Sequence, residues 1–120
     1  MMELQTIQKR NKLNNVHVAD EKGNGNAYHI YHINQVGETN NLVGEIQFQN
    51  GARTHEESIA GILDADLLEI CRHRLQSFQK GDFATRENAI ALTHIEEALL
   101  WLNKRVEDRA ERNVLGTDIK

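Results

Sequence analysis

The second half of the chain carries a hydrophobic stripe with the period of a helix. Five apolar residues of this stripe follow 3-4-3-4 spacing: Leu92, Ile95, Leu99, Leu102 and Val106. This spacing places side chains on one helix face and is close to a coiled-coil repeat. Because the chain has no proline to interrupt it, we expect a helix over residues 83–112. At about 1.5 Å per residue, this helix would be roughly 45 Å long.

A shorter helix is expected over residues 65–79, directly before the long one. Its stripe has 3-4-3 spacing and consists of Leu68, Cys71, Leu75 and Phe78. Asp64 is a suitable N-cap for this helix. We expect Gly81 to end it in the left-handed conformation and Asp82 to cap the long helix. The two helices are therefore predicted to form an antiparallel hairpin with a very short connection.

The first half of the chain has the alternating pattern of strands instead. The runs 16–18, 28–33 and 43–49 combine alternation with β-branched and aromatic residues. The glycine- and asparagine-rich run 21–26 between the first two is typical of a hairpin turn. These runs predict a small three-stranded antiparallel ribbon.

The expected fold class is therefore α+β, in a single domain over residues 1–120. A β-ribbon occupies residues 14–50, and the α-helical hairpin occupies residues 63–113. Residues 1–13 show no clear pattern, and residues 52–62 are irregular and polar.

Composition narrows the functional classes. The 120 residues have a formal charge of -4, whereas a general nucleic-acid binder would be strongly basic. The sequence contains no run of 18 apolar residues, so we expect no membrane span. The polar N-terminus lacks the apolar centre of a signal peptide. The one cysteine, Cys71, excludes an internal disulfide framework and is consistent with a reducing cytoplasm. Because Cys71 falls on a helical stripe, we expect a buried, unreactive thiol.

The lengths of the two helices predict a partner chain. The long helix is about twice as long as the first, which cannot cover its whole apolar stripe. A second copy of the chain is the simplest cover, and an isologous homodimer is the commonest such arrangement.

The two ends of the long stripe carry the candidate binding residues. Phe78, Arg86 and Asn88 lie at one end, beside a helix N-terminus that suits a phosphate group. Phe78 could stack on a base, and Asn88 could hydrogen-bond a base edge or a ribose. At the other end Arg105, Arg109 and Arg112 recur at i, i+4 and i+7, which suits bidentate contacts to a diphosphate.

One small ligand cannot reach both ends within one chain. Asn88 and Arg105 are 17 positions apart, which corresponds to about 25 Å along a helix. In an antiparallel dimer, however, the C-terminal half of one long helix lies beside the N-terminal half of the other. This geometry predicts two equivalent nucleotide sites per dimer, each shared between the subunits.

Simpler interpretations remain open for each of these residues. Phe78 could close the core of the hairpin, and Asn88 could satisfy a backbone group near the helix start. The arginines alternate with acidic residues, so they could belong to a solvated face with i,i+4 ion pairs. His29 and His32 are three apart in a strand and face opposite sides, which argues against a metal site. The sequence shows neither a nucleophile paired with a base nor a glycine-rich phosphate loop. We therefore do not expect an enzyme, and we expect no cofactor.

Four sequence runs carry a resemblance to a known family. They are FQNG at 48–51, HRLQSFQ at 73–79, GDFATRENAIALTHIEEALLWLNKR at 81–105 and EDRAERNVLGT at 107–117. These runs are similar to phage anti-defence sponge proteins. One branch of that family sequesters the glycocyclic ADP-ribose signals of Thoeris immunity, and the other sequesters cyclic dinucleotides and trinucleotides of CBASS immunity. The expected β-ribbon before the hairpin resembles the Thoeris branch.

The resemblance implies a binding protein of the host bacterial cytoplasm rather than an enzyme. Members hold the signal molecule intact at a homodimer interface, and some assemble into hexamers as trimers of dimers. By position, Phe78 and Asn88 match the family's base-side contacts. Arg105, Arg109 and Arg112 match its phosphate-side contacts, and Arg53 is implied as a further contact.

Overall fold

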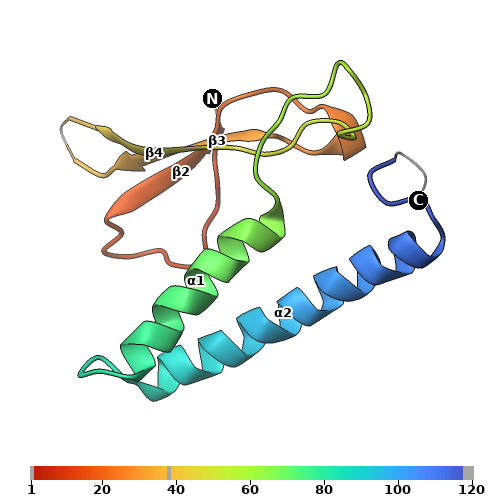
Figure 1. Cartoon of the computed structure of the whole chain (residues 1–120). Coiled ribbons are helices and arrows are strands. Elements are labelled where there is room, and N and C mark those ends of the chain that lie inside the picture. The colour runs from red at the N-terminus through yellow and green to blue at the C-terminus, as the bar shows by residue number, and fades with distance from the viewer. Residues whose placement is uncertain (1, 38, 118–120) are drawn as a thin grey trace. The chain divides into compact units, whose positions relative to one another are not determined.

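The computed structural model describes residues 2–37 and 39–117 of the chain. It divides into two compact units, Met1–Ile62 and Leu63–Lys120 (Figure 1). The first unit holds the strands and the second holds both long helices. The expected α+β class is therefore confirmed, with an antiparallel sheet followed by an α-helical hairpin. The expectation of a single domain over residues 1–120 stays a prediction.

The first unit, which we call the sheet unit, is a four-stranded antiparallel sheet with the order β1-β2-β3-β4. Its strands are β1 (Met2–Glu3), β2 (Asn14–Val18), β3 (Ile30–Gln35) and β4 (Leu42–Gln47). The prediction of three strands was wrong. The additional strand β1 has two residues, which is too short to show an alternating pattern.

The strand register gathers the apolar side chains on one face of the sheet. Val16 pairs with Ile33, Val18 pairs with Tyr31, and Tyr31 pairs in turn with Ile46. Because paired residues point to the same side, these side chains form one layer. Val18 is buried within it. The ring of Tyr31 also meets that of Phe48 edge to face, with centroids 5.7 Å apart.

The turn between β2 and β3 contains the short 3-10 helix η1 (Asn24–Asn26), where a glycine-rich turn was expected. Gly25 and Asn26 both have positive φ angles, which glycine and asparagine tolerate best. A side chain on Gly23 would begin 3.3 Å from the His29 ring. The turn can therefore approach the buried His29, whose backbone N–H donates to the Asp20 carboxylate at 3.0 Å.

The polar segment 52–62 lacks a regular element, as its sequence predicts, yet it is held to the end of β4. Two isolated bridges join Asn50 to Ile59 and Phe48 to Ile62. A Cβ atom on Gly61 would lie only 2.4 Å from the carbonyl carbon of Phe48. Glycine at this position is thus what lets the two backbones approach each other.

The second unit, which we call the helical unit, is a hairpin of α1 (Asp64–Gln79) and α2 (Arg86–Glu111). The start of α1 is fixed by Asp66, whose carboxylate accepts a hydrogen bond from the Leu63 N–H at 2.8 Å. The start of α2 is fixed by Thr85, whose hydroxyl accepts a hydrogen bond from the Asn88 N–H at 3.0 Å.

Two predictions about the turn between these helices were wrong. Gly81 does not have the positive φ angle expected of it, and Asp82 is not the N-cap of α2. The reason lies in Gln79, whose side chain accepts from the N–H of Thr85 and donates to its carbonyl, both at 3.1 Å. These two hydrogen bonds from one side chain hold Thr85 at the N-cap position. As a result, α2 begins three residues later than expected.

The inward face of α1 also differs from the predicted stripe. Its half-buried residues include Ala65, Leu68, Arg72, Leu75 and Gln79, which follow 3-4-3-4 spacing. Cys71 is exposed, so the prediction of a buried thiol was wrong. The inward face of α1 is rotated relative to the predicted stripe because Arg72 and Gln79 have polar partners on or next to α2. A pattern of hydrophobic residues does not reveal such polar pairs.

The apolar stripe of α2 is only partly covered, as the helix lengths predict. With 16 and 26 residues, α1 and α2 are about 24 and 39 Å long. Leu92, Ile95 and Leu99 are half-buried, whereas Leu102 and Val106 are exposed. Arg109 is the only buried residue of either helix. The helical unit therefore presents apolar surface that one chain does not cover, and the homodimer stays a prediction.

Candidate functional site

The hairpin turn brings two phenylalanines and an arginine together. The rings of Phe78 and Phe83 meet edge to face, with centroids 6.4 Å apart. The guanidinium carbon of Arg74, one turn before Phe78 on α1, lies 5.4 Å from the centroid of the Phe78 ring. Phe78 is 36% exposed and Phe83 is 74% exposed. The Phe78 ring is therefore held in place by its neighbours while part of it remains open to a ligand.

Asn88 lies at the same end of the hairpin, in the first turn of α2. Its backbone N–H is bound by Thr85. Its side chain is half-buried and makes no hydrogen bond to another residue within 2–37 or 39–117. The amide atoms of Asn88 are not sealed from water, so they are available to hydrogen-bond a ligand.

Arg86 and the amide groups of the first turn bring positive charge to the same end, beside the acidic Glu87 of that turn. Arg86 is the first residue of α2 and is exposed. The N-terminus of a helix carries a partial positive charge and unpaired N–H groups, both of which attract phosphate. The turn thus combines an aromatic ring, an amide and a positive field, which is the chemistry that a nucleotide requires.

The three arginines at the far end of α2 do not behave as a uniform stripe. Arg105 and Arg112 are exposed, but Arg109 is only 7% exposed. Arg109 donates hydrogen bonds to the carbonyls of Val114 and Thr117, at 3.1 and 2.8 Å. It therefore fixes the chain that follows α2. A contact between Arg109 and a ligand stays a prediction, as it does for Arg105 and Arg112.

Arg53 belongs to the sheet unit, in the segment after β4. Its guanidinium donates to the side chain of Gln49 at 2.8 Å and to the carbonyl of Gly61 at 3.2 Å. Gln49 also accepts the N–H of Gly61 at 3.3 Å. Arg53 thus helps to close the segment 52–62, and its role towards a ligand stays a prediction.

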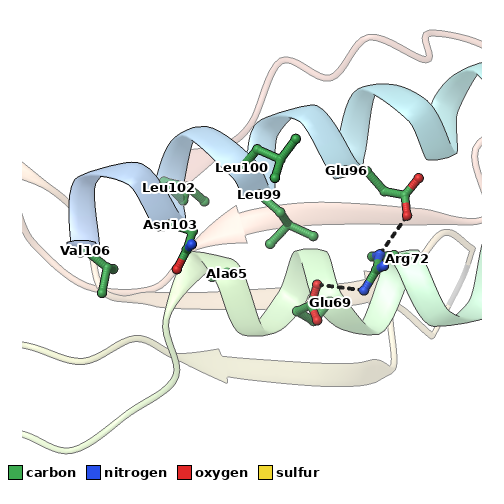
Figure 2. Close-up of a pocket in the computed structure, with 9 residues that line it drawn as sticks. All are labelled: Ala65, Glu69, Arg72, Glu96, Leu99, Leu100, Leu102, Asn103 and Val106. Atoms are coloured by element: carbon green, nitrogen blue, oxygen red, sulfur yellow. Dashed lines mark hydrogen bonds and ion pairs between the residues drawn. The ribbon is translucent and has the colours of Figure 1, made fainter. Parts of the chain in front are cut away.

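A groove of about 620 Å³ lies between the first half of α1 and the second half of α2 (Figure 2). Its apolar wall includes Ala65, Leu99, Leu102 and Val106. At the end nearer the turn, Arg72 lies between Glu96 at 2.9 Å and Glu69 at 3.6 Å. The pKa of Arg72 is raised above its ordinary value, chiefly because it donates a hydrogen bond to Glu96, and the charge of Glu69 adds to this.

The two sets of proposed binding residues, at the hairpin turn and at the far end of α2, lie far apart within one chain. Asn88 and Arg105 both lie in α2, about 25 Å apart along the helix axis. The structure thus brings Phe78 and Asn88 to one end of the hairpin and the arginines to the other. A ligand of nucleotide size could touch both groups only if a second chain contributed one of them.

Neither helix is long and apolar enough to cross a membrane in the part of the chain that the structure describes. Residues 2–37 and 39–117 also contain no group of three or more His, Cys, Asp or Glu side chains placed to hold a metal ion.

Comparison with known families matches residues 40–107 to the family described as "Acb2/Tad1, hairpin domain". This region contains β4, both sides of the hairpin turn and most of α2, and it amounts to more than half of the chain. The chain belongs to this family. The resemblance seen in the sequence is therefore confirmed. Arg109 and Arg112 lie just beyond the matched residues, whereas Phe78, Asn88 and Arg105 lie within them.

A relative within this family supports the same placement. The chain is 47% identical over 75 residues to "Thoeris anti-defense 1" of Bacillus phage SBSphiJ7. That stretch covers 62% of this chain and 52% of the relative, so the chain matches about half of the relative's length.

Sequence reasoning missed two residues of the turn, Arg74 and Phe83. Arg74 precedes Phe78 by four positions, which is the spacing of neighbours on a helix surface. That spacing could have pointed to the contact. The position of Phe83 could not be read in the same way, because it depends on the turn conformation that Gln79 and Thr85 impose.

Proposed function

We propose that this protein is a phage anti-defence sponge. It binds cyclic ADP-ribose-type signals of Thoeris immunity, such as glycocyclic ADP-ribose, in the cytoplasm of the infected bacterium. It holds the signal without cleaving it and so lowers the free concentration available to the host effector. Membership of the Acb2/Tad1 hairpin family and the phage relative named for Thoeris anti-defence both support this proposal.

The observation that carries the proposal is the arrangement at the hairpin turn. A partly exposed ring, Phe78, lies at the same end of the hairpin as the unpartnered amide of Asn88 and the N-terminus of α2. An adenine base could stack on the ring and hydrogen-bond the amide, while a phosphate approaches the helix end. Arg86 adds positive charge there.

The phosphate side of the site comes from a second copy of the chain. Arg105 and Arg112, with Arg109 between them, lie too far along α2 to reach a ligand at their own turn. An antiparallel homodimer puts this end of one α2 beside the turn of the other. The uncovered residues Leu102 and Val106 favour such a dimer, because burial of their side chains stabilises it.

The energetic demand is modest for such a site. Submicromolar binding requires more than about 8 kcal/mol. Stacking on a base contributes about 1–3 kcal/mol, and charge-assisted hydrogen bonds to phosphates about 1.5–3 kcal/mol each. A site preorganised by the hairpin turn can therefore reach this affinity.

Recovery of the ligand tests the sponge mechanism directly. The protein is incubated with a limiting amount of glycocyclic ADP-ribose, then heat-denatured, and the supernatant is analysed. We expect the signal to disappear from the native solution and to return unaltered after denaturation. Degradation products in the supernatant would mean that the protein is an enzyme.

Variants at the turn test the location of the site. We expect Phe78→Ala and Asn88→Ala to weaken binding by at least about tenfold, because each removes a contact worth roughly 1–3 kcal/mol. His73→Ala, an exposed position on α1, is the control and should bind like the wild type. If both turn variants bind normally while folded, the site lies elsewhere.

Mixed dimers test whether the site is shared. An Asn88→Ala chain and an Arg105→Ala chain are each expected to bind poorly alone. In a mixed dimer, one of the two sites combines the intact Asn88 of one chain with the intact Arg105 of the other. Binding should therefore return at half of the sites, whereas sites contained within single chains would not recover.

The second candidate is a sponge of the anti-CBASS type, which takes cyclic dinucleotides or trinucleotides. The matched family covers both branches, and the turn could hold any purine base. The same recovery experiment with a panel of cyclic nucleotides separates the two candidates. Assembly into a hexamer, as a trimer of dimers, would provide further interfaces, and its mass is measurable by sedimentation.

A further inference from the structure

The first turn of α2 is held in place by a side chain of the other helix. Gln79, the last residue of α1, accepts a hydrogen bond from the N–H of Thr85 and donates one to its carbonyl, both at 3.1 Å. The hydroxyl of Thr85 in turn accepts a hydrogen bond from the N–H of Asn88 at 3.0 Å. Gln79 is half-buried, whereas Thr85 is exposed. A single glutamine therefore fixes the cap from which α2 begins.

The local sequence favours a different start, three residues earlier. Aspartate ranks above threonine as an N-cap, and Asp82 precedes Thr85 by three positions. Phe83 and Ala84 follow Asp82 directly, with no glycine or proline to break a helix that begins there. Because the local pattern permits this earlier start, the two hydrogen bonds made by the Gln79 side chain are what select the observed one.

The two starts differ in the N–H groups that they leave open to a ligand. In a helix that begins at Arg86, the N–H groups of the first turn have no intrahelical carbonyl to bind. In a helix that began at Phe83, the N–H of Arg86 would bind the carbonyl of Asp82. The N–H of Glu87 would bind the carbonyl of Phe83. The open end of the helix would move by about 4.5 Å, and the carboxylate of Asp82 would lie there and repel a phosphate.

The residues assigned to the base depend on the same choice. Phe83 lies outside α2, and its ring meets that of Phe78 edge to face, with centroids 6.4 Å apart. As the first residue of a longer helix, Phe83 would take helical backbone angles and leave its place in the present turn. Asn88 would become the sixth residue of the helix instead of the third. The ring of Phe78 and the amide of Asn88 would thus lose their present surroundings.

We propose that Gln79 is a positioning residue for the nucleotide site. Its two hydrogen bonds keep α2 from starting at Phe83. They thereby hold Phe78, Asn88 and the first-turn N–H groups in the arrangement that binds a base and a phosphate. Gln79 acts through these groups and does not itself touch the ligand. This role rests on the proposed function, because it concerns the same site.

Gln79→Met tests this role, because methionine has a similar volume and makes neither hydrogen bond. We expect the variant to bind glycocyclic ADP-ribose at least about tenfold more weakly than the wild type, since two hydrogen bonds that favour the binding arrangement are lost. Gln76→Met is the matched control, because it makes the same change at a half-buried position of the same helix. It should bind like the wild type.

Removal of the competing cap should rescue binding. Asp82→Ala alone leaves the start of α2 unchanged and should bind like the wild type. In the double variant Gln79→Met/Asp82→Ala the earlier start has lost its cap, so we expect α2 to begin at Arg86 again. Affinity should then return to within about threefold of the wild type. A variant whose turn was only damaged would gain nothing from the second substitution.

Amide exchange distinguishes a moved helix start from a loosened turn. In Gln79→Met, exchange at Arg86 and Glu87 should slow, because their N–H groups enter intrahelical bonds, whereas a loosened turn would speed it up. Unchanged or faster exchange, or normal binding by Gln79→Met, would overturn the role of Gln79 while the sponge function stood. If the wild type itself bound no cyclic nucleotide, the sponge function would fail, and the role of Gln79 in its site with it.

Discussion

The two units of this protein differ in which side chains they bury. The sheet unit closes on itself: Val18 and His29 are buried, and the segment after β4 is bridged back to the end of that strand. Among residues 63–117, the helical unit has no buried apolar side chain, and the one buried residue, Arg109, is charged. Within this chain its hydrophobic stripe is therefore surface rather than core.

This difference supports the proposed placement of the site in the helical unit. A unit that is complete in one chain can serve as a support, whereas a unit with uncovered apolar surface gains stability from a partner or a ligand. The family match supports the same division, because its residues 40–107 contain the whole hairpin turn but only one complete strand, β4. Three substitutions, taken from the largest expected effect to the smallest, test the comparison.

The largest effect is expected from Gly61→Ala in the sheet unit. The new Cβ would lie within 2.6 Å of three backbone atoms of Gln47 and Phe48, so the bridge between Phe48 and Ile62 must separate. We expect the free energy of unfolding to fall by about 3 kcal/mol, as measured by urea denaturation at fixed protein concentration.

Gly44→Ala is the control for this substitution. Its Cβ would meet only the side chain of Ile33, at 3.9 Å, and should cost less than about 1 kcal/mol. Equal losses for the two variants would show that the sheet unit is not closed by the approach at Gly61.

An intermediate effect is expected from Arg109→Ala in the helical unit. The substitution removes both hydrogen bonds from the guanidinium to the carbonyls of Val114 and Thr117. We expect a loss of about 2 kcal/mol and faster amide exchange over residues 113–117.

Arg105→Ala is the matched control, since Arg105 is exposed on the same helix. It should change stability by less than about 0.5 kcal/mol. If Arg105→Ala destabilised the fold as much as Arg109→Ala, the anchoring role of Arg109 would be wrong. Comparison of ligand binding by the two variants then separates anchoring from phosphate contact.

The smallest effect is expected from Thr85→Ala at the hairpin turn. Loss of the hydroxyl that caps α2 should cost about 1 kcal/mol, whereas Thr85→Ser keeps the cap. Asp82→Ala should be nearly neutral, because Asp82 does not cap the helix. Thermal denaturation followed by circular dichroism measures all three, and a larger loss for Asp82→Ala than for Thr85→Ala would contradict the turn described here.

Local pattern was sufficient for some of these features. The alternation in the first half predicts β2, β3 and β4 to within a few residues, because side chains in a strand alternate between its faces. The stripe from Leu92 to Val106 predicts α2 and its uncovered end. Phe78, Asn88 and the arginines were proposed as site residues from spacing and from resemblance to the sponge family, and their contact with a ligand stays a prediction.

Features that depend on polar partners distant in sequence could not be predicted in this way. The inward face of α1 was misplaced because Arg72 meets Glu96, 24 positions away. The cap of α2 was misplaced because Gln79 holds Thr85 rather than Asp82. Hydrophobic periodicity carries no information about such pairs, since either partner alone is an ordinary surface residue.

The sequence by itself determined that this chain is an α+β member of its family, with a long helix that one chain does not cover. Only the tertiary structure decided that Arg109 is buried beneath its own C-terminal turn while Arg105 stays exposed. It also decided that Phe78 is held between Arg74 and Phe83. The physical reason is that period and composition fix which face of an element is apolar, whereas the orientation of a charged or aromatic side chain depends on the atoms that the fold brings next to it.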